Sequence, residues 1–458
     1  MYYDLSDCAV SVADHDVRIG WSETVEAFLA HDATAADRLA KILVADPDFA
    51  LAHAVNGLML ITLARSDLVP IAADCLKRAR LATSNRAVTS REGIFVHALE
   101  QWLLDSPRRA AALLEESVAD HPFDALAIKL AHTLRFMLGD QAQMLSVLQR
   151  AAPKFGQHHP LAGFVNGCFA FALEEQGNYS EAEHVGRMAV DLSPRDVWGR
   201  HAVTHVLEMT GRAEEGLFWL ADRGQWAHAN NFRLHLTWHQ ALFNMERGES
   251  AEAFVLYDRH MLTECSDDYR DIASCASLLA RFEYAGADVG ERWEEVADRA
   301  ERRIKDRRLV FADLHYILAL LGANRVESAE TIARALVDDS FAHSSDERRI
   351  AARGGGIAAC GLLAFHDGDY AEAAKLFSVA RANLVEIGGS NAQRDLFDQV
   401  YIESLVRSGD DERAIELLER RLSDRVGANR FAVERLSRYQ QTSSARLGGL
   451  ATLSASFA

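Results

Sequence analysis

The chain has 458 residues, 49% hydrophobic and 25% charged, a globular balance that excludes extensive disorder. The net charge is −18, with 49 lysines and arginines against 67 aspartates and glutamates, which argues against sequence-independent nucleic-acid binding. No run of 18 apolar residues occurs, and the first 20 residues lack the basic start and apolar stretch of a secretory signal. We therefore expect a cytoplasmic protein with no nucleic-acid and no membrane partner.

The six cysteines show no metal-binding or disulfide pattern. They lie far apart, without a CxxC pair, at Cys8, Cys75, Cys168, Cys265, Cys275 and Cys360. This spacing excludes a zinc ribbon or a disulfide framework and suits a reducing compartment.

Proline usage indicates long helices. The chain has seven prolines, and the 264 residues after Pro194 contain none. Proline breaks helix interiors, so a long proline-free stretch favours continuous helices. Alanine, leucine, glutamate and arginine dominate this stretch and are strong helix formers, whereas the alternation typical of strands is scarce.

A helix, a tight turn and a second helix recur along the chain. The first turns fall near Ser66 and Ser106 and lack glycine. The later turns carry glycines at positions 139, 177, 211, 248, 286, 322, 368 and 409, spaced by 34 to 46 residues. This period, with two helices in each unit, is typical of an α-solenoid.

The second helices show the alanine spacing of tetratricopeptide repeats. One example, GNYSEAEHVGRMAVDLSP, places Ala182 and Ala189 after Gly177. Small residues at these positions let neighbouring helices approach closely. We predict an all-α fold, a right-handed solenoid of about ten degenerate tetratricopeptide-like helix pairs. We expect residues 1–440 to form one continuous domain and residues 441–458 a flexible tail.

Four stretches carry a family resemblance: HAVTHVLEMTGRAEEGLFWL, NNFRLHLTWHQALFNMERGESAEAFVLYDRHM, SLLARFEYAGADVGERW and FADLHYILALLG. With them the chain resembles the tetratricopeptide repeat protein 38 family over most of its length, most densely at 198–322. The resemblance implies an all-helical solenoid of degenerate repeats and implies no particular activity.

Histidines gather in the centre of the chain. Residues 201–239 hold five of the 18 histidines. His201 and His205 form one pair four residues apart, and His235 and His239 form a second pair 34 residues later. Side chains four residues apart share a helix face, and 34 residues is one repeat. We therefore expect all four imidazoles on the first helices of successive repeats, facing the concave groove.

Other side chains extend this patch. Glu208 continues the same stripe, and His315 lies near the edge of the same face in a later repeat. Trp198 and Trp238 each lie close to one of the histidines and favour a small-ligand pocket, because indole stacks on planar ligands. Asn231 precedes a helix, where it either caps the helix or contacts a ligand.

Three interpretations of the histidine patch stay open. The histidines can be buried and hydrogen-bonded for structural reasons. They can hold a divalent metal such as zinc, on His201, His205, His235 and His239. Without a metal, His205, His239 and Glu208 would act as catalytic acid or base groups. The ligand-binding residues would then be His201, His235, His315, Trp198, Trp238 and Asn231.

The functional hypothesis is a tetratricopeptide-like solenoid that binds a small molecule or a short peptide at a pocket lined by histidine and tryptophan. Hydrolase- or lyase-type catalysis by histidine or by a metal is an added hypothesis, and the sequence leaves open whether the chain is an enzyme. The alternative is a non-catalytic scaffold that binds a segment of a partner protein in the concave groove.

Overall fold

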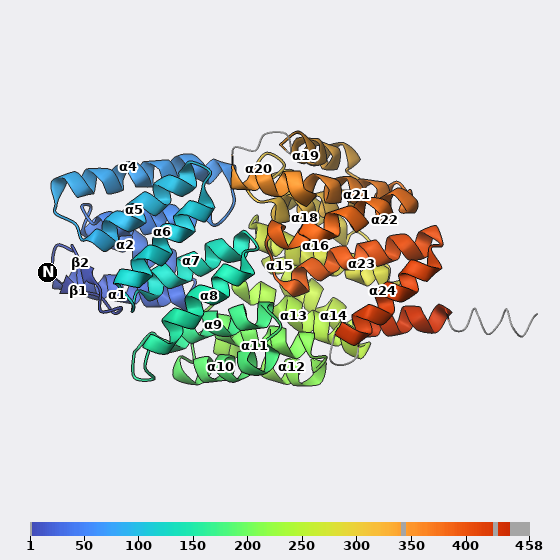
Figure 1. Cartoon of the computed structure of the whole chain (residues 1–458), viewed down its shortest axis with the longest axis horizontal. Helices are drawn as coiled ribbons and strands as arrows, with labels where there is room; N and C mark the ends of the chain where they lie inside the picture. Colours follow the sequence, from blue (N-terminus) through green and yellow to red (C-terminus); the bar gives the residue numbers. More distant parts are fainter. Residues whose placement is uncertain (1, 340–344, 425–428, 440–458) are drawn as a thin grey trace, which may run out of the picture.

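The chain is built almost entirely of helices in a computed structural model that describes residues 2–339, 345–424 and 429–439 (Figure 1). Among these residues the only strands are β1 (Tyr2–Tyr3) and β2 (Ala9–Val10), which pair antiparallel. The predicted all-α helical-repeat fold is therefore confirmed. The predicted tail, 441–458, lies outside the described residues. No helix in the described ranges has both the length and the apolar character needed to cross a bilayer.

The helices of the N-terminal half are α1 (His15–Leu29), α2 (Ala35–Ala45), α3 (Ala50–Ile61), η1 (Ser66–Leu68), α4 (Val69–Asn85), α5 (Ser90–Leu103), α6 (Pro107–Asp120), α7 (Ala125–Met137), α8 (Gln141–Ala151), η2 (Ala152–Lys154), α9 (Ala162–Glu175), α10 (Tyr179–Leu192), α11 (Val197–Met209), α12 (Ala213–Trp219) and η3 (Arg223–Trp226).

The helices of the C-terminal half are α13 (Phe232–Arg247), α14 (Ser250–Leu256), η4 (Tyr257–Met261), α15 (Leu262–Glu264), α16 (Tyr269–Tyr284), α17 (Arg292–Glu301), α18 (Val310–Gly322), α19 (Val326–Asp339), α20 (Asp346–Ile350), η5 (Ala351–Gly355), α21 (Gly356–His366), α22 (Tyr370–Ala380), η6 (Arg381–Ile387), α23 (Asn391–Ser408) and α24 (Asp411–Asp424).

Left-handed residues end the first helix of most pairs. The predicted turn glycines at 139, 177, 211, 248, 286, 368 and 409 have φ between 62° and 83°, a region that glycine enters without steric cost. In the two earlier turns Ala64 and Asp105 adopt this conformation instead, with φ of 53° and 55°. The turn pattern read from the sequence therefore locates the helix pairs.

The turn prediction was wrong at Gly322. This residue is the last of α18, and the left-handed residue of that turn is Asn324, with φ of 57°. A Cβ atom at position 322 would lie 2.2 Å from the ring of Trp293. Glycine is present at this position because α17 packs closely against α18.

The first helices of the central pairs form the interior. Helices α7, α9, α11, α13, α16, α18 and α23 are buried over most of their length, whereas second helices such as α10 and α17 bury only one face. A helix buried on all sides belongs to a core, whereas a helix buried on one face covers it. The repeats therefore wrap an inner layer of helices with an outer one.

Several contacts join turns that are far apart in the sequence. Ser66 donates from its amide and hydroxyl groups to a carboxylate oxygen of Asp306, at 2.9 and 2.8 Å. The amide of Asn391 donates to Glu175 at 2.9 Å, and the guanidinium of Arg394 lies 3.2 Å from the same carboxylate. Both carboxylates are buried. These contacts therefore join repeats that are far apart in the sequence.

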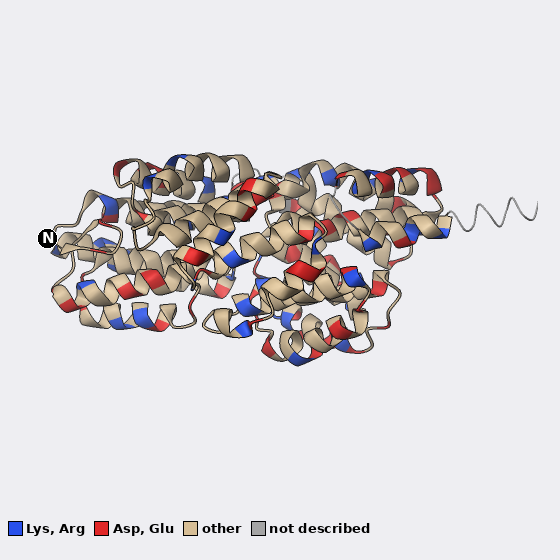
Figure 2. Cartoon of the chain, turned by 90° about the horizontal axis from the view of Figure 1, so that it is seen from below, with Lys and Arg blue, Asp and Glu red and all other residues tan. Residues whose placement is uncertain are grey.

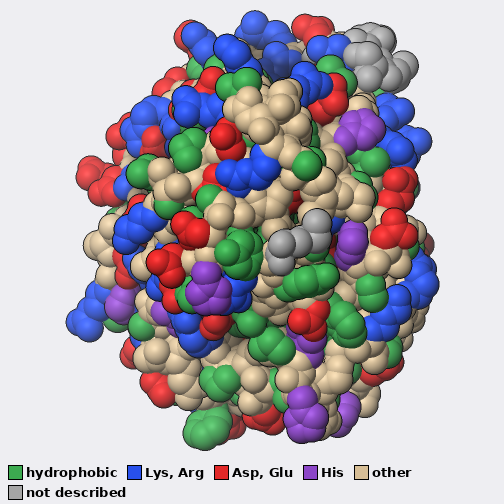
Figure 3. All heavy atoms as spheres, turned by 90° about the vertical axis from the view of Figure 1, so that its left-hand side faces the viewer, with side chains coloured by type: hydrophobic (Ala, Val, Ile, Leu, Met, Phe, Trp, Pro, Cys, Tyr) green, Lys and Arg blue, Asp and Glu red, His purple; other side chains and the backbone are tan. Residues whose placement is uncertain are grey.

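The outer surface mixes both charges. Lysines and arginines alternate with aspartates and glutamates along the outer helices in Figure 2. On the face drawn in Figure 3, hydrophobic, acidic, basic and histidine side chains are interspersed.

Two glycines test the turn interpretation. Gly177 has φ of +77° and an added Cβ meets nothing within 4 Å, so Gly177→Ala introduces backbone strain without a clash. We expect it to lower the free energy of unfolding by about 1 kcal/mol. Gly93 lies inside α5, and an added Cβ there also meets nothing within 4 Å. Gly93→Ala should therefore raise the free energy of unfolding by about 0.5–1 kcal/mol. Urea denaturation measures both, and the same sign for the two variants would contradict the assignment.

Candidate functional site

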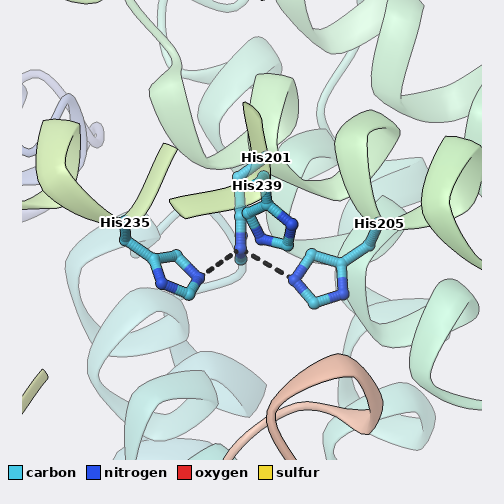
Figure 4. Close-up of side chains that lie close together, drawn as sticks. All are labelled: His201, His205, His235 and His239. Carbon is cyan, nitrogen blue, oxygen red and sulfur yellow. Dashed lines mark hydrogen bonds between the residues drawn. The ribbon is translucent and has the colours of Figure 1, made fainter. Parts of the chain in front are cut away.

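The four histidines lie where the repeat period places them. His201 and His205 share one face of α11, and His235 and His239 share one face of α13. All four side chains are buried, with exposed fractions of 0 to 8%. Figure 4 shows their rings converging from the two helices. The two pairs, which lie one repeat apart, therefore form a single four-histidine cluster.

The ring nitrogens of this cluster face one another. The Nε2 atom of His201 lies 2.8 Å from Nε2 of His205 and 3.0 Å from Nε2 of His235 (Figure 4). One nitrogen from each of the four rings can be chosen so that all lie within 4.8 Å of one another. The Nε2 atom of His239 is buried without a hydrogen-bond partner in the described part of the chain.

Hydrogen bonds among the four rings cannot satisfy all of the nitrogens that face one another. A neutral imidazole nitrogen carries either one hydrogen or one lone pair, both in the ring plane. His201 Nε2 can therefore pair well with His205 or with His235, but not with both. The remaining nitrogen and that of His239 then stay buried and unpaired, at about 1–3 kcal/mol each.

Polar groups on the opposite side of the rings hold their orientation. Nδ1 of His239 lies 2.8 Å from a carboxylate oxygen of Glu208. Nδ1 of His235 lies 3.3 Å from the hydroxyl of Ser274. Nδ1 of His205 lies 3.5 Å from Glu174 without a hydrogen bond between them, and burial raises the pKa of that carboxyl group well above its usual value. A carboxylate or hydroxyl on the distal nitrogen is the usual support of a metal-binding histidine, because it fixes the tautomer and the ring orientation.

Burial keeps the four imidazoles neutral. It lowers the pKa of His239 to about 3 and the pKa values of the other three well below the usual value for histidine. Neutral imidazole is the form that binds a metal. A histidine whose pKa lies so far below neutrality is a weak general base, since proton transfer is most efficient when the pKa is near the working pH.

The cluster can hold a metal chemically. Four neutral nitrogen donors suit zinc, copper, iron or nickel. With metal–nitrogen bonds of about 2.0–2.1 Å, two donors lie at most about 4.2 Å apart, so nitrogens already within 4.8 Å need only small adjustments.

A cavity of about 360 Å³ adjoins the cluster. His201 and His235 form part of its wall, together with Trp198 and Asn231. Asp32, which lines this cavity, forms a β-bridge with a loop that is distant in the sequence. Its volume is in the range of small-molecule sites.

Other predicted site residues lie away from the cavity. His315 is buried next to Phe311, to whose carbonyl its Nδ1 donates at 2.7 Å, and it joins neither the cluster nor the cavity wall. Trp238 is buried in the core, where its indole donates to Ser277 at 3.0 Å. Glu208 borders a second cavity on the far side of His239. The patch is therefore narrower than the sequence predicts.

Sequence reasoning missed two groups that the repeat register could have revealed. Glu174 precedes Gly177 by three residues, as Glu208 precedes Gly211. Lys129 precedes its own turn glycine by ten residues, as His201 does, and it lies in the cavity wall. Ser274 follows a different spacing, so no sequence signal indicates its role.

Comparisons with known proteins add little. No family model matches this chain. A chain in the solved structure of Naa15/Naa10 bound to HypK-THB is similar over 96% of this chain and 68% of that one, at 15% sequence identity and a TM-score of 0.24. At this level the likeness supports no inference about function, and the helical-repeat fold rests on the helices themselves.

His315 provides a pH test of the sealed interior. Burial lowers its pKa to about 4, so the unfolded chain takes up a proton below pH 6.5 that the folded chain refuses. The stability contributed by the neutral ring is lost as the pH falls from about 6.5 towards 4, and amounts to about 2 kcal/mol between pH 7 and pH 5. When unfolding is measured at both pH values, His315→Gln should lose less stability on acidification than the unaltered chain does.

The matched control is His97→Gln, since His97 is exposed on α5 and its ring meets water in the folded chain. That variant should keep the full loss of stability on acidification. An identical pH dependence for His315→Gln and the unaltered chain would contradict the burial of His315.

Proposed function

We propose that this helical-repeat protein holds a divalent transition-metal ion on His201, His205, His235 and His239 and binds a small molecule in the adjoining cavity. The observation that carries the proposal is the Nε2 atom of His201, which faces two other Nε2 atoms within 3.0 Å that hydrogen bonds cannot both satisfy. A metal ion would accept lone pairs from all four rings at once. Glu208 and Ser274 support the proposal because they hydrogen-bond to the distal nitrogens of His239 and His235.

The metal proposal redefines the catalytic roles predicted from the sequence. His205 and His239 become ligands rather than acid and base groups, and Glu208 becomes the group that orients His239. Four histidine ligands fill a tetrahedral shell, so a bound ion would supply Lewis-acid chemistry of the hydrolase or lyase type only to a ligand that adds a fifth position from the cavity. Access would come from the side of His201 and His235, because these two ligands border the cavity.

A small molecule is favoured over the alternative occupant, a segment of a partner protein. Repeat solenoids commonly bind peptides in an open groove. Here contacts such as Ser66 with Asp306 and Glu175 with Asn391 join distant turns across the concave side. An extended segment would need these contacts to open. Scaffolding of a partner protein therefore remains the second proposal, supported by the fold class only.

We also propose that the chain is related to the tetratricopeptide repeat protein 38 family and acts in the cytoplasm. The all-α helical repeats are what that resemblance implies, and the six cysteines are free in the structure, as suits a reducing compartment.

Metal content tests the central part of this proposal. The purified chain should retain about one equivalent of transition metal, and chelation should lower its melting temperature. Restoring the ion at 100 times its Kd should stabilise the fold by about 2.7 kcal/mol. His201→Gln removes the central ligand at similar volume and should abolish both retention and stabilisation. Elemental analysis and thermal denaturation measure the two effects.

His315→Gln is the control, since His315 is buried as deeply but lies outside the cluster. It should retain the metal. Equal metal retention by both variants, or no effect of chelation on the unaltered chain, would refute the four-histidine centre.

A further inference from the structure

Lys129 is a buried residue whose ammonium group forms no hydrogen bond or ion pair with the described residues. It lies on α7, has an exposed fraction of 3% and forms part of the cavity wall. Its ammonium group lies 4.0 Å from the centre of the Trp198 ring, a cation–π contact. Within the described residues, no carboxylate lies at ion-pair distance from it. An ammonium group that borders a cavity and has no acceptor from the protein is available to an anion bound in that cavity.

The acidic groups of the same wall are already engaged. Asp32 accepts from the amide and hydroxyl of Thr34 and pairs with Arg195. Asp268 pairs with Arg270. The third acidic residue of the wall, Asp271, accepts hydrogen bonds from Ser266 and Asn231. Among the cations that border this cavity, Arg270 is thus held by Asp268 and Lys129 remains available.

Burial also affects the charge of Lys129. It lowers the pKa of the ammonium group, although the nearby Cys168 and Asp196 act in the opposite direction. An anion bound next to Lys129 would favour the charged form and remove this penalty.

The rest of the wall is mostly apolar. The side chains include Met59, Leu60, Leu63, Phe136, Phe232 and Phe311. One available cation in an apolar cavity matches a ligand with one negative charge on an apolar body.

We propose that the cavity binds an apolar small molecule that bears a single carboxylate, with the carboxylate held by the ammonium group of Lys129. The proposal deepens the proposed function and rests on its small-molecule part. A carboxylate suits this site better than a phosphate, since a phosphate carries up to two charges and three strong acceptor oxygens. The guanidinium fork that would suit a phosphate belongs to Arg270 and is occupied by Asp268.

Three probes with the same ten-carbon chain test the charge requirement. Decanoate, decanol and decylamine are titrated into the unaltered protein, followed by calorimetry and by the fluorescence of Trp198 and its neighbours. We expect decanoate to bind at least about tenfold more tightly than either other probe, as for one hydrogen bond to a charged group. Equal affinity for decanoate and decanol would overturn the proposal without any variant.

Lys129→Met tests the residue itself, because methionine keeps an unbranched apolar side chain and removes the charge. It should weaken decanoate binding at least about tenfold and leave decanol binding unchanged. Lys154→Met, at an exposed lysine, is the control and should bind decanoate like the unaltered chain. Unchanged decanoate affinity in Lys129→Met would also overturn the proposal.

The metal content of each sample separates this proposal from the four-histidine centre. Metal retention without preferential decanoate binding would refute the role of Lys129 and leave the metal centre standing. Lys129-dependent binding of decanoate to a chain that retains no metal would support the carboxylate site and refute the metal centre. If the chain binds neither decanoate nor metal, both proposals fail.

Discussion

Exclusion of water from the inner helices is the constraint on which the rest of the structure depends. Because the inner helices are buried over most of their length, a polar group on them is costly unless it is neutral or has a partner. The interior shows both solutions. Arg91 is fully buried with Asp4 and Asp124 at 3.0 and 2.7 Å, whereas His205 and His239 are held neutral. Polar groups that keep an unsatisfied donor or acceptor in this interior indicate where a ligand is expected.

Two such exceptions lie beside the same cavity. One is the set of facing nitrogens around His201, which suits a cation that accepts lone pairs. The other is the ammonium group of Lys129, which suits an anion. A ligand with a carboxylate at Lys129 would extend through the apolar part of the cavity, whose wall includes His201 and His235. The two proposals therefore describe one binding site, which takes a cation at the histidines and an anion at Lys129.

The sequence determines the fold more completely than the site. Turn glycines such as Gly177 mark helix ends because backbone conformation is a local property, and the exception at Gly322 arises from the packing of Trp293, which is not local. The 34-residue period brings His201 and His235 together. It could not indicate which distant turns contact one another, because that depends on curvature summed over many repeats. For the same reason it placed His315 too close to the patch.

X-ray absorption spectroscopy of the zinc-loaded protein tests the central claim most directly, because it reports the atoms bound to the ion. The four-histidine centre predicts a shell of nitrogen atoms at about 2.0–2.1 Å with the multiple scattering of imidazole rings. Replacing His235 by glutamine should remove one imidazole contribution from that shell. A shell dominated by sulfur or carboxylate oxygen, or one that is unchanged in the His235→Gln variant, would show that zinc binds elsewhere.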